Sequence, residues 1–195
     1  MADVAGFGSP VRTTEDLKVV LAGLYRAFEE AFEAAGIPWL DCQKQDMGDG
    51  LHIFAPGEIP RGLFAGALLN RLAEALDRHN ETHTIGEEIR LRLALNTAEV
   101  TRIENGRVFG HGIIHTKRLL DSAPLRQGLR GSPAPLAVIV SSSFYRDVVK
   151  SRAEYRHDAY RRVHIEEKED QDSAWIRLLD PRPDRQIISG MAGDQ

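Results

Sequence analysis

The chain has only one cysteine, Cys42, among its 195 residues. A single cysteine excludes an intramolecular disulfide and a cysteine-rich zinc site. No apolar run is long enough to cross a membrane and no signal-peptide pattern is present, so we expect a cytoplasmic protein with no membrane partner. The formal net charge of −4 provides no global attraction for nucleic acid, and we expect no nucleic-acid partner.

The rest of the composition is typical of a globular protein. Hydrophobic residues make up 42% of the chain and charged residues 28%, and both values are ordinary. A chain of this length can bury a hydrophobic core within one domain. The sequence therefore predicts one folded domain over residues 1–180 and a polar, disordered tail over residues 181–195.

The spacing of apolar residues predicts an alternation of helices and strands. It predicts a first helix over residues 13–35, with Thr13 and Asp16 as a capping box. The further elements are helices after Pro60, at 110–120 and after Ser141, and strands at 89–95, 136–140, 160–165 and 174–179. This order predicts an α+β fold, a ferredoxin-like sandwich in which helices pack on one face of a mostly antiparallel sheet.

The segment around Asp49 combines a carboxylate with a tight turn. Gly48-Asp49-Gly50 separates two stretches with strand character and predicts a β-hairpin. Asp3 has a similar setting near the start, three residues before Gly6. Two such carboxylates, if the fold brings them together, would bind a hard cation together with nucleotide phosphates. Turn chemistry alone also explains the hairpin segment, and this alternative stays open.

Several segments, in the correct order, resemble the catalytic domain of the class III nucleotidyl cyclases, the adenylyl and guanylyl cyclase family. The segments are Asp3 to Phe7, Gly48-Asp49, Arg92 to Val100, Phe109 to Leu119, Val138 to Tyr145, and Tyr160 to Leu179. The resemblance covers nearly the whole chain up to Leu179. It implies the class III cyclase type of the ferredoxin-like sandwich.

The resemblance implies a metal site made by Asp3, Asp49 and the carbonyl of Val4. These groups would hold two divalent ions, Mg²⁺ or Mn²⁺, on a triphosphate. The implied partner is therefore a nucleoside triphosphate.

The resemblance also implies contacts to the phosphates and to the transition state. The backbone of Gly6, Phe7 and Gly8 would donate N–H groups to phosphate oxygens ahead of the first helix, whose dipole favours anions. Arg118 would stabilise the charge that develops on the transferring phosphoryl group. Because the family's acids and arginine come from different protomers, the resemblance implies a homodimer.

Three positions depart from the family pattern. The family's asparagine is Ile114 here, and isoleucine can neither donate nor accept a hydrogen bond. The purine-selecting lysine is Gln45, and its partner aspartate is Arg107. An amide and a cation suit the carbonyl oxygens of a pyrimidine, so we predict that UTP or CTP is preferred to ATP. The alternative is that Arg107 is an exposed loop residue with no ligand contact.

Three functions remain open at this point. A divergent nucleotidyl cyclase would form a 3′,5′-cyclic nucleotide from a nucleoside triphosphate, release pyrophosphate and act in signalling. A pseudo-cyclase would keep the fold but serve as a nucleotide sensor or protein-interaction module, and a scaffold would bind no nucleotide. Only Met1 and Ala2 precede Asp3, whereas the family has a full strand there. Either translation begins further upstream, or the sheet has lost most of a central strand, which predicts uncovered edge groups.

Overall fold

The computed structural model describes residues 1–103, 108–166 and 171–182. Its main sheet has seven strands in the order β2-β3-β1-β4-β7-β9-β8. The strands are β1 (Ala2–Val4), β2 (Gln43–Asp46), β3 (Gly50–Phe54), β4 (Leu91–Leu95), β7 (Leu136–Ser141), β8 (Arg161–Glu166) and β9 (Gln171–Leu179). The β4–β7 pair is parallel, and the other five pairs of this sheet are antiparallel. The predicted mixed α+β fold with a mostly antiparallel sheet is confirmed.

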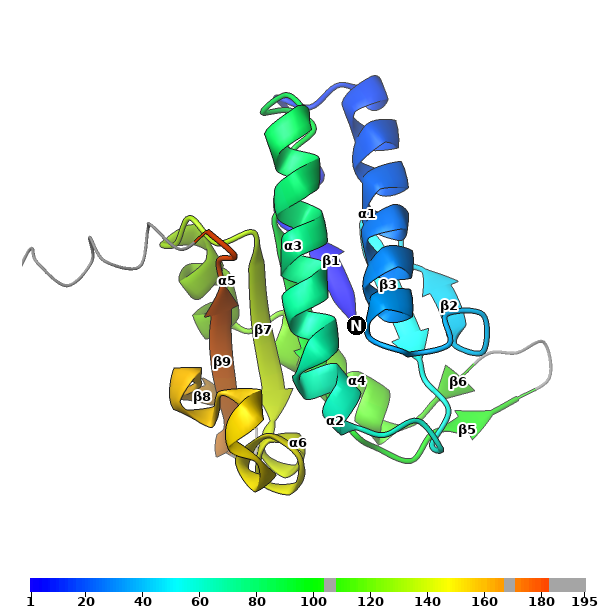
Figure 1. Ribbon diagram of the computed structural model, residues 1–195, viewed down its shortest axis with the longest axis vertical. Coiled ribbons are helices and arrows are strands. Elements are labelled where there is room, and N and C mark those ends of the chain that lie inside the picture. Colours follow the sequence, from blue (N-terminus) through cyan, green and yellow to red (C-terminus); the bar gives the residue numbers. More distant parts are fainter. Residues whose placement is uncertain (104–107, 167–170, 183–195) are drawn as a thin grey trace, which may run out of the picture.

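Two long helices cover one face of the sheet (Figure 1). Helix α1 (Thr14–Ala34) begins at the predicted Thr13–Asp16 capping box. The predicted second helix is divided at Gly66 into α2 (Gly62–Ala65) and α3 (Ala67–Thr82). The apolar faces of α1 and α3 form a core with alternate residues of β4 and β7, among them Leu93 and Val138.

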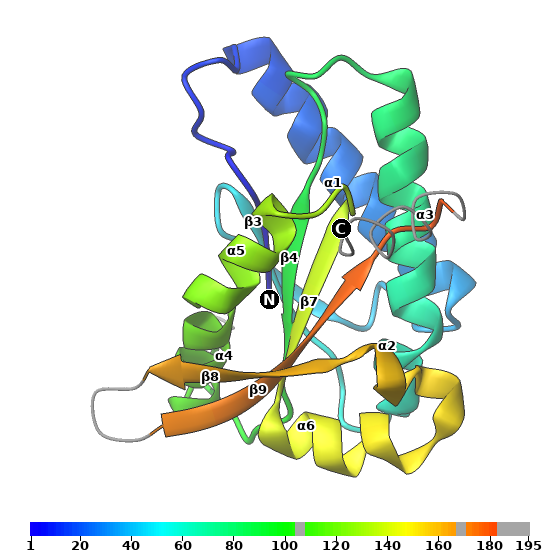
Figure 2. The ribbon, with the colours of Figure 1, turned by 90° about the vertical axis from the view of Figure 1, so that its left-hand side faces the viewer.

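A second helical layer covers part of the opposite face, and Figure 2 shows the two layers on either side of the sheet. It consists of α4 (His111–Leu120) and α5 (Ala123–Arg130). These helices pack on the other set of alternate strand residues, including Ala94, Ala137 and Ile139. The prediction that helices lie on one face is therefore wrong, because the central strands are apolar on both faces and each face must be covered.

The first strand is short but paired on both sides. Strand β1 lies between β3 and β4, with Asp3 opposite Gly50 on one side and Arg92 on the other. The backbone nitrogen of Met1 donates to the Ala94 carbonyl at 3.0 Å, and Ala94 N–H donates back to Met1 at 2.8 Å. The short strand thus pairs with β3 and β4 over these residues only. Beyond Met1, residues of both neighbouring strands line a second cavity, among them Phe54 and Leu95, which agrees with the uncovered edges predicted from the length of β1.

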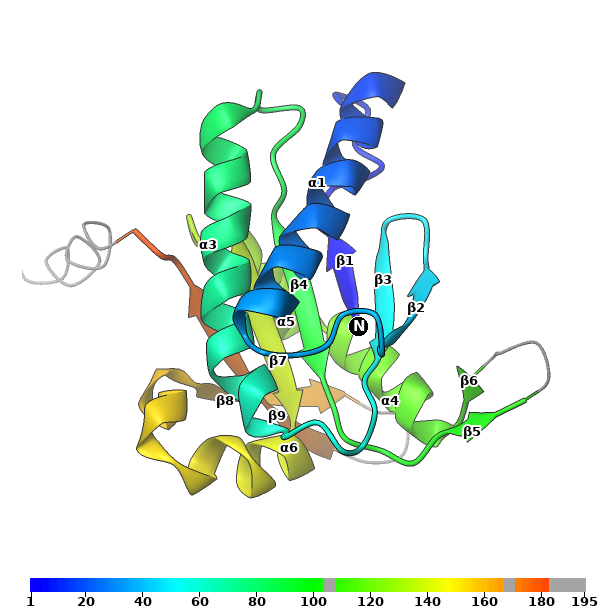
Figure 3. The same cartoon turned by 45° about the vertical axis from the view of Figure 1, so that its right-hand side comes forward.

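The remaining elements lie around the ends of the sheet. Strands β5 (Thr101–Arg102) and β6 (Val108–Phe109) form a separate hairpin that projects from the body beside β2 and β3 (Figure 3). Helix α6 (Ser142–Asp147) begins at Ser141, whose hydroxyl accepts from the Phe144 N–H. Three short 3₁₀ turns, Val149–Ser151, Ala153–Tyr155 and His157–Ala159, lead into β8.

Candidate functional site

The β2–β3 turn places Asp49 beside the first strand. Gly48 has a φ of +85°, a conformation that glycine adopts without steric strain. The Asp46 carboxylate accepts from the Gly48 N–H at 2.7 Å and from the Tyr25 hydroxyl at 2.7 Å, which fixes the turn. The Val4 N–H donates to the Asp49 carbonyl at 2.9 Å. The fold therefore brings the ends of the two acid-bearing segments together.

Gly50 is required for this close approach. A Cβ atom at residue 50 would lie 2.0 Å from the Ala2 carbonyl oxygen and 2.7 Å from the Cα of Asp3. Both are backbone atoms that cannot move without separating β1 from β3. The Gly48-Asp49-Gly50 sequence is thus more than a hairpin turn, because its last glycine lets β3 pack against the strand that carries Asp3.

Asp3 is held by a bidentate ion pair that the sequence analysis did not identify. Arg92 donates from Nε to Oδ1 at 2.8 Å and from Nη2 to Oδ2 at 2.7 Å. The side chains are only 7% exposed for Asp3 and 15% for Arg92. Burial raises the pKa of Asp3 and the Asp49 charge raises it further, whereas Arg92 and Lys117 oppose this shift. The charges of Asp49 and Lys117 therefore both act on the Asp3 carboxylate.

The loop after β1 does not use the helix dipole as predicted. Gly6 has a φ of +67° and its carbonyl accepts from Ser9, while Phe7 N–H turns back to Val4 at 3.3 Å. Helix α1 begins only at Thr14, and its start is closed by a capping box in which the Asp16 carboxylate accepts from the Thr13 N–H and the Thr13 hydroxyl accepts from the Asp16 N–H. An acid at that end would repel phosphate. The expected help from the helix dipole at Gly6 to Gly8 is therefore wrong, and their backbone contacts to phosphate stay a prediction.

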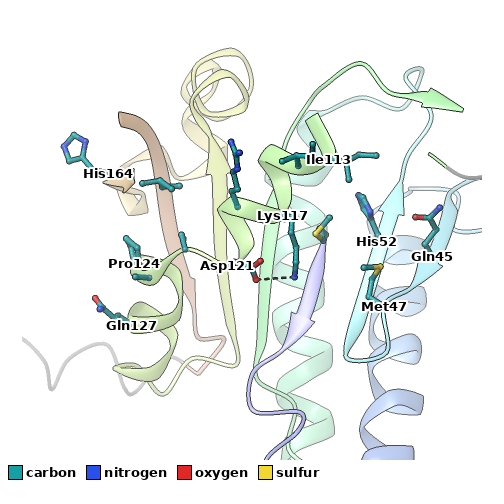
Figure 4. A pocket seen from close by; sticks show the side chains of 15 residues that line it. Gln45, Met47, His52, Ile113, Lys117, Asp121, Pro124, Gln127 and His164 are labelled. Carbon is teal, nitrogen blue, oxygen red and sulfur yellow. Dashed lines mark hydrogen bonds and ion pairs between the residues drawn. The ribbon is translucent and has the colours of Figure 1, made fainter. Parts of the chain in front are cut away.

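A cavity of about 870 Å³ lies along the exposed side of α4. Its volume is within the range of small-molecule sites. Gln45, Ile114 and Arg118, the three described positions expected at the base and the transition state, all line it. Figure 4 shows Gln45, Met47 and His52 on one side, α4 in the middle with Lys117 and Asp121, and His164 at the far end. The structure therefore brings Gln45 and Arg118 into one cavity.

The two acids lie next to this cavity and are not among its lining residues. Lys117 and Met1 both line the cavity, and Met1 directly precedes the strand that carries Asp3. This arrangement places the strand that carries Asp3 beside the cavity that Gln45 and Arg118 line. Arg107 lies outside the described residues.

Several cavity residues were missed by the sequence analysis. Lys117 donates to Asp121 at 3.2 Å, and both side chains are about half exposed. His52 is buried, and burial lowers its pKa to about 4, so the ring is neutral at pH 7. The β2–β3 hairpin pairs His52 with Gln45, but no pattern in the sequence predicted that the His52 side chain would be buried.

The donor set of Asp3, Asp49 and the Val4 carbonyl consists of hard oxygen atoms, which suits Mg²⁺ or Mn²⁺. Among the described residues no group of three or more His, Cys, Asp or Glu side chains could hold a metal ion. Magnesium uses one or two carboxylates and completes its coordination with phosphate and water. The residues therefore fit an ion that arrives with a nucleotide, provided that Asp3 shares its oxygens with Arg92.

The comparisons with known proteins assign the class of fold. No model of a protein family matches the chain, and no curated protein matches it. A solved structure does match, and the chain has the fold of a class III nucleotidyl cyclase catalytic domain. That structure is a monomeric crystal structure of a double mutant of the guanylyl cyclase domain of the RhoGC fusion protein from the aquatic fungus Blastocladiella emersonii. The TM-score is 0.54 at 18% sequence identity, and the match covers 91% of each chain.

No helix in the described part of the chain is both long and apolar enough to span a bilayer.

Proposed function

We propose that the protein is a divergent nucleotidyl cyclase that converts a nucleoside triphosphate into a 3′,5′-cyclic nucleotide and pyrophosphate. The supporting observation is that the turn carrying Asp49 lies against the strand carrying Asp3, beside a cavity lined by Gln45 and Arg118, within a cyclase fold. In this reaction the ribose 3′-hydroxyl attacks the α-phosphorus, and the bond to the pyrophosphate oxygen breaks. The attacking hydroxyl loses its proton and the pyrophosphate leaves as an anion.

In the proposed reaction the chain's own residues position the substrate and stabilise charge. Asp3, Asp49 and the Val4 carbonyl would hold two divalent ions, Mg²⁺ or Mn²⁺, which supply charge neutralisation on the phosphates when bound. Arg118 would donate to the phosphoryl oxygens, since a guanidinium stays charged and bonds phosphate in a fork. The backbone of Gly6, Phe7 and Gly8 would contact the phosphate chain. Enzymes accelerate phosphoryl transfer mainly by positioning the reacting groups and by stabilising charge in the transition state.

The direct test is product formation. The purified protein is incubated with ATP, GTP, CTP or UTP and Mn²⁺, and the products are identified by mass spectrometry. A 3′,5′-cyclic nucleotide that disappears in Asp49→Asn supports the proposal. A product that persists unchanged in both Asp3→Asn and Asp49→Asn contradicts the mechanism.

The second candidate function is a pseudo-cyclase with a signalling role as a nucleotide sensor or protein-interaction module. Two observations favour it: the cavity is lined by Ile114, where the resemblance implies a hydrogen-bonding asparagine, and Arg92 engages both oxygens of Asp3. Thermal unfolding separates the candidates, because a ligand that binds the native state raises the midpoint by mass action. A shift with nucleotide and Mn²⁺ but no product favours the sensor, and no shift with any nucleotide favours a scaffold.

We predict that UTP or CTP is bound or converted about tenfold better than ATP, since a correct polar contact to a base is worth at least this ratio. Gln45 is half-buried and lines the cavity, so its amide can donate to and accept from a base edge. Arg107 is expected to add a donor to a pyrimidine carbonyl, and Arg107→Asp to weaken the preference. The measurement is competition against labelled UTP. Displacement by ATP with equal or better affinity contradicts the prediction.

A shared active site in a homodimer predicts complementation between inactive variants. Asp49→Asn and Arg118→Ala are each expected to lose about 10²-fold in rate. A refolded 1:1 mixture should regain about a quarter of the wild-type rate, because half of the dimers are mixed and each has one intact site. The rate of cyclic nucleotide formation measures this. Activity of the mixture that stays at the level of the single variants contradicts a shared site.

A further inference from the structure

The structure assigns a phosphate-binding role to Lys117, a residue that the family resemblance does not include. We propose that its ammonium binds the triphosphate held by Asp3 and Asp49 of the same chain. This inference rests on the proposed function. It concerns a cation that is placed beside the acids within one protomer, whereas Arg118 is expected to act on the nucleotide of the other protomer.

The position of Lys117 on α4 separates it from Arg118. Residues four positions apart in a helix are neighbours on the same face. Lys117 therefore lies in one row with Ile113 and Asp121, and Arg118 lies in the adjacent row with Ile114. Residues of both rows line the cavity. Figure 4 shows Lys117 extending from α4 toward Asp121 on the side of β1. Met1, directly before β1, lines the same cavity as Lys117, so the ammonium lies on the side of the strand that carries Asp3, and its charge acts on that carboxylate.

The charges around the acid pair leave room for a further cation. Asp3 and Asp49 raise the negative charge at the end of β1, and the bidentate pair with Arg92 neutralises only one of them. A triphosphate brings several more negative charges to the same place. A side chain that can donate three N–H groups from a flexible stem is suited to phosphate oxygens.

The contact that now holds Lys117 is weak enough to be exchanged. Its partner Asp121 lies four residues further along the helix at 3.2 Å, and the two side chains are 50% and 46% exposed. Exposed pairs of this kind contribute little to stability. A charge-assisted bond to phosphate is stronger than such a pair. Lys117 can therefore turn from Asp121 to a phosphate at little cost.

The first experiment measures binding of pyrophosphate with Ca²⁺ to the full-length protein by calorimetry. Lys117→Met should weaken binding about tenfold, whereas Asp121→Asn should leave it equal or tighter, because it removes a competing acceptor. Lys18→Met is the matched control, since Lys18 also forms an exposed pair within a helix, with Glu15 at 2.7 Å. A structural role for the Lys117–Asp121 pair predicts that both cavity variants weaken binding alike. That outcome, or unchanged binding in Lys117→Met, overturns the inference.

The second experiment tests which protomer Lys117 serves. If Lys117 acts together with Asp3 and Asp49 of the same chain, a mixture of Lys117→Met and Arg118→Ala restores activity. In the mixed dimer the Arg118→Ala chain supplies both acids and the lysine, and the Lys117→Met chain supplies Arg118. Lys117→Met mixed with Asp49→Asn should then stay impaired, since the surviving acids lie on the chain without the lysine. The opposite pattern overturns the inference. Failure of the Asp49→Asn and Arg118→Ala mixture would instead contradict the shared site, so the two failures are distinguishable.

Discussion

Replacing Ile114 with asparagine is expected to raise the rate of cyclic nucleotide formation by about 10²–10³-fold, the typical contribution of one preorganised donor to a transition state. Ile114 borders the same cavity as Gln45 and Arg118, and it precedes Arg118 by one helical turn. An asparagine there could donate to the oxygen on which charge develops. Because Ile114 is 52% exposed, a polar side chain should change the free energy of unfolding by no more than about 0.5 kcal/mol.

Two matched variants identify the source of the gain. Ile114→Leu keeps an apolar side chain, and Ile114→Asp has nearly the size of asparagine but presents an anion without a donor. Neither should accelerate the reaction, and the aspartate should slow it by repelling phosphate. Initial rates with saturating Mn²⁺ and each nucleotide are the measurement. A rate that does not rise in Ile114→Asn, while the protein still binds nucleotide, favours the pseudo-cyclase.

The sequence was sufficient to predict those parts of the site that depend on local structure. The Gly48-Asp49-Gly50 turn, the capped start of α1 and the helix that carries Arg118 all follow from short patterns, and the structure has each of them. The cyclase resemblance also assigned Gln45 to the base and Arg118 to the transition state, and the structure places both at one cavity. Their chemical roles stay predictions.

The features that were missed depend on contacts between distant residues. The Arg92–Asp3 pair joins residues 89 positions apart, and it depends on β1 lying beside β4 in one particular register. Helix α5 has only eight residues and two buried leucines, Leu125 and Leu129, so its periodicity was too short to recognise. The second helical layer was missed for a related reason, because the sequence does not say which face of an apolar strand a later helix will cover.

The Arg92–Asp3 ion pair leads to the largest predicted effect on stability. Arg92→Met should lower the free energy of unfolding by about 3–5 kcal/mol, because it leaves a carboxylate without its partner in a nearly buried position. Asp3 is 7% exposed at its side chain, so water cannot replace the lost hydrogen bonds. Arg71→Met is the control, since Arg71 pairs with Glu74 at 3.0 Å but both side chains are at least 41% exposed. It should change the free energy of unfolding by less than about 1 kcal/mol.

The pH dependence and a double variant separate the lost ion pair from lost packing. Burial already raises the pKa of Asp3, and removing Arg92 removes an influence that lowers it. The folded variant then binds a proton more tightly than the unfolded chain, so its stability falls as the pH rises above the unfolded value of about 3.9. The deficit relative to wild type should therefore be largest at neutral pH and shrink toward pH 4. Asp3→Asn combined with Arg92→Met should be more stable than Arg92→Met alone in urea unfolding at pH 7, because no unpaired carboxylate remains. A deficit that is independent of pH and unchanged in the double variant would show that Arg92 stabilises the fold through packing of its side-chain stem rather than through its charge.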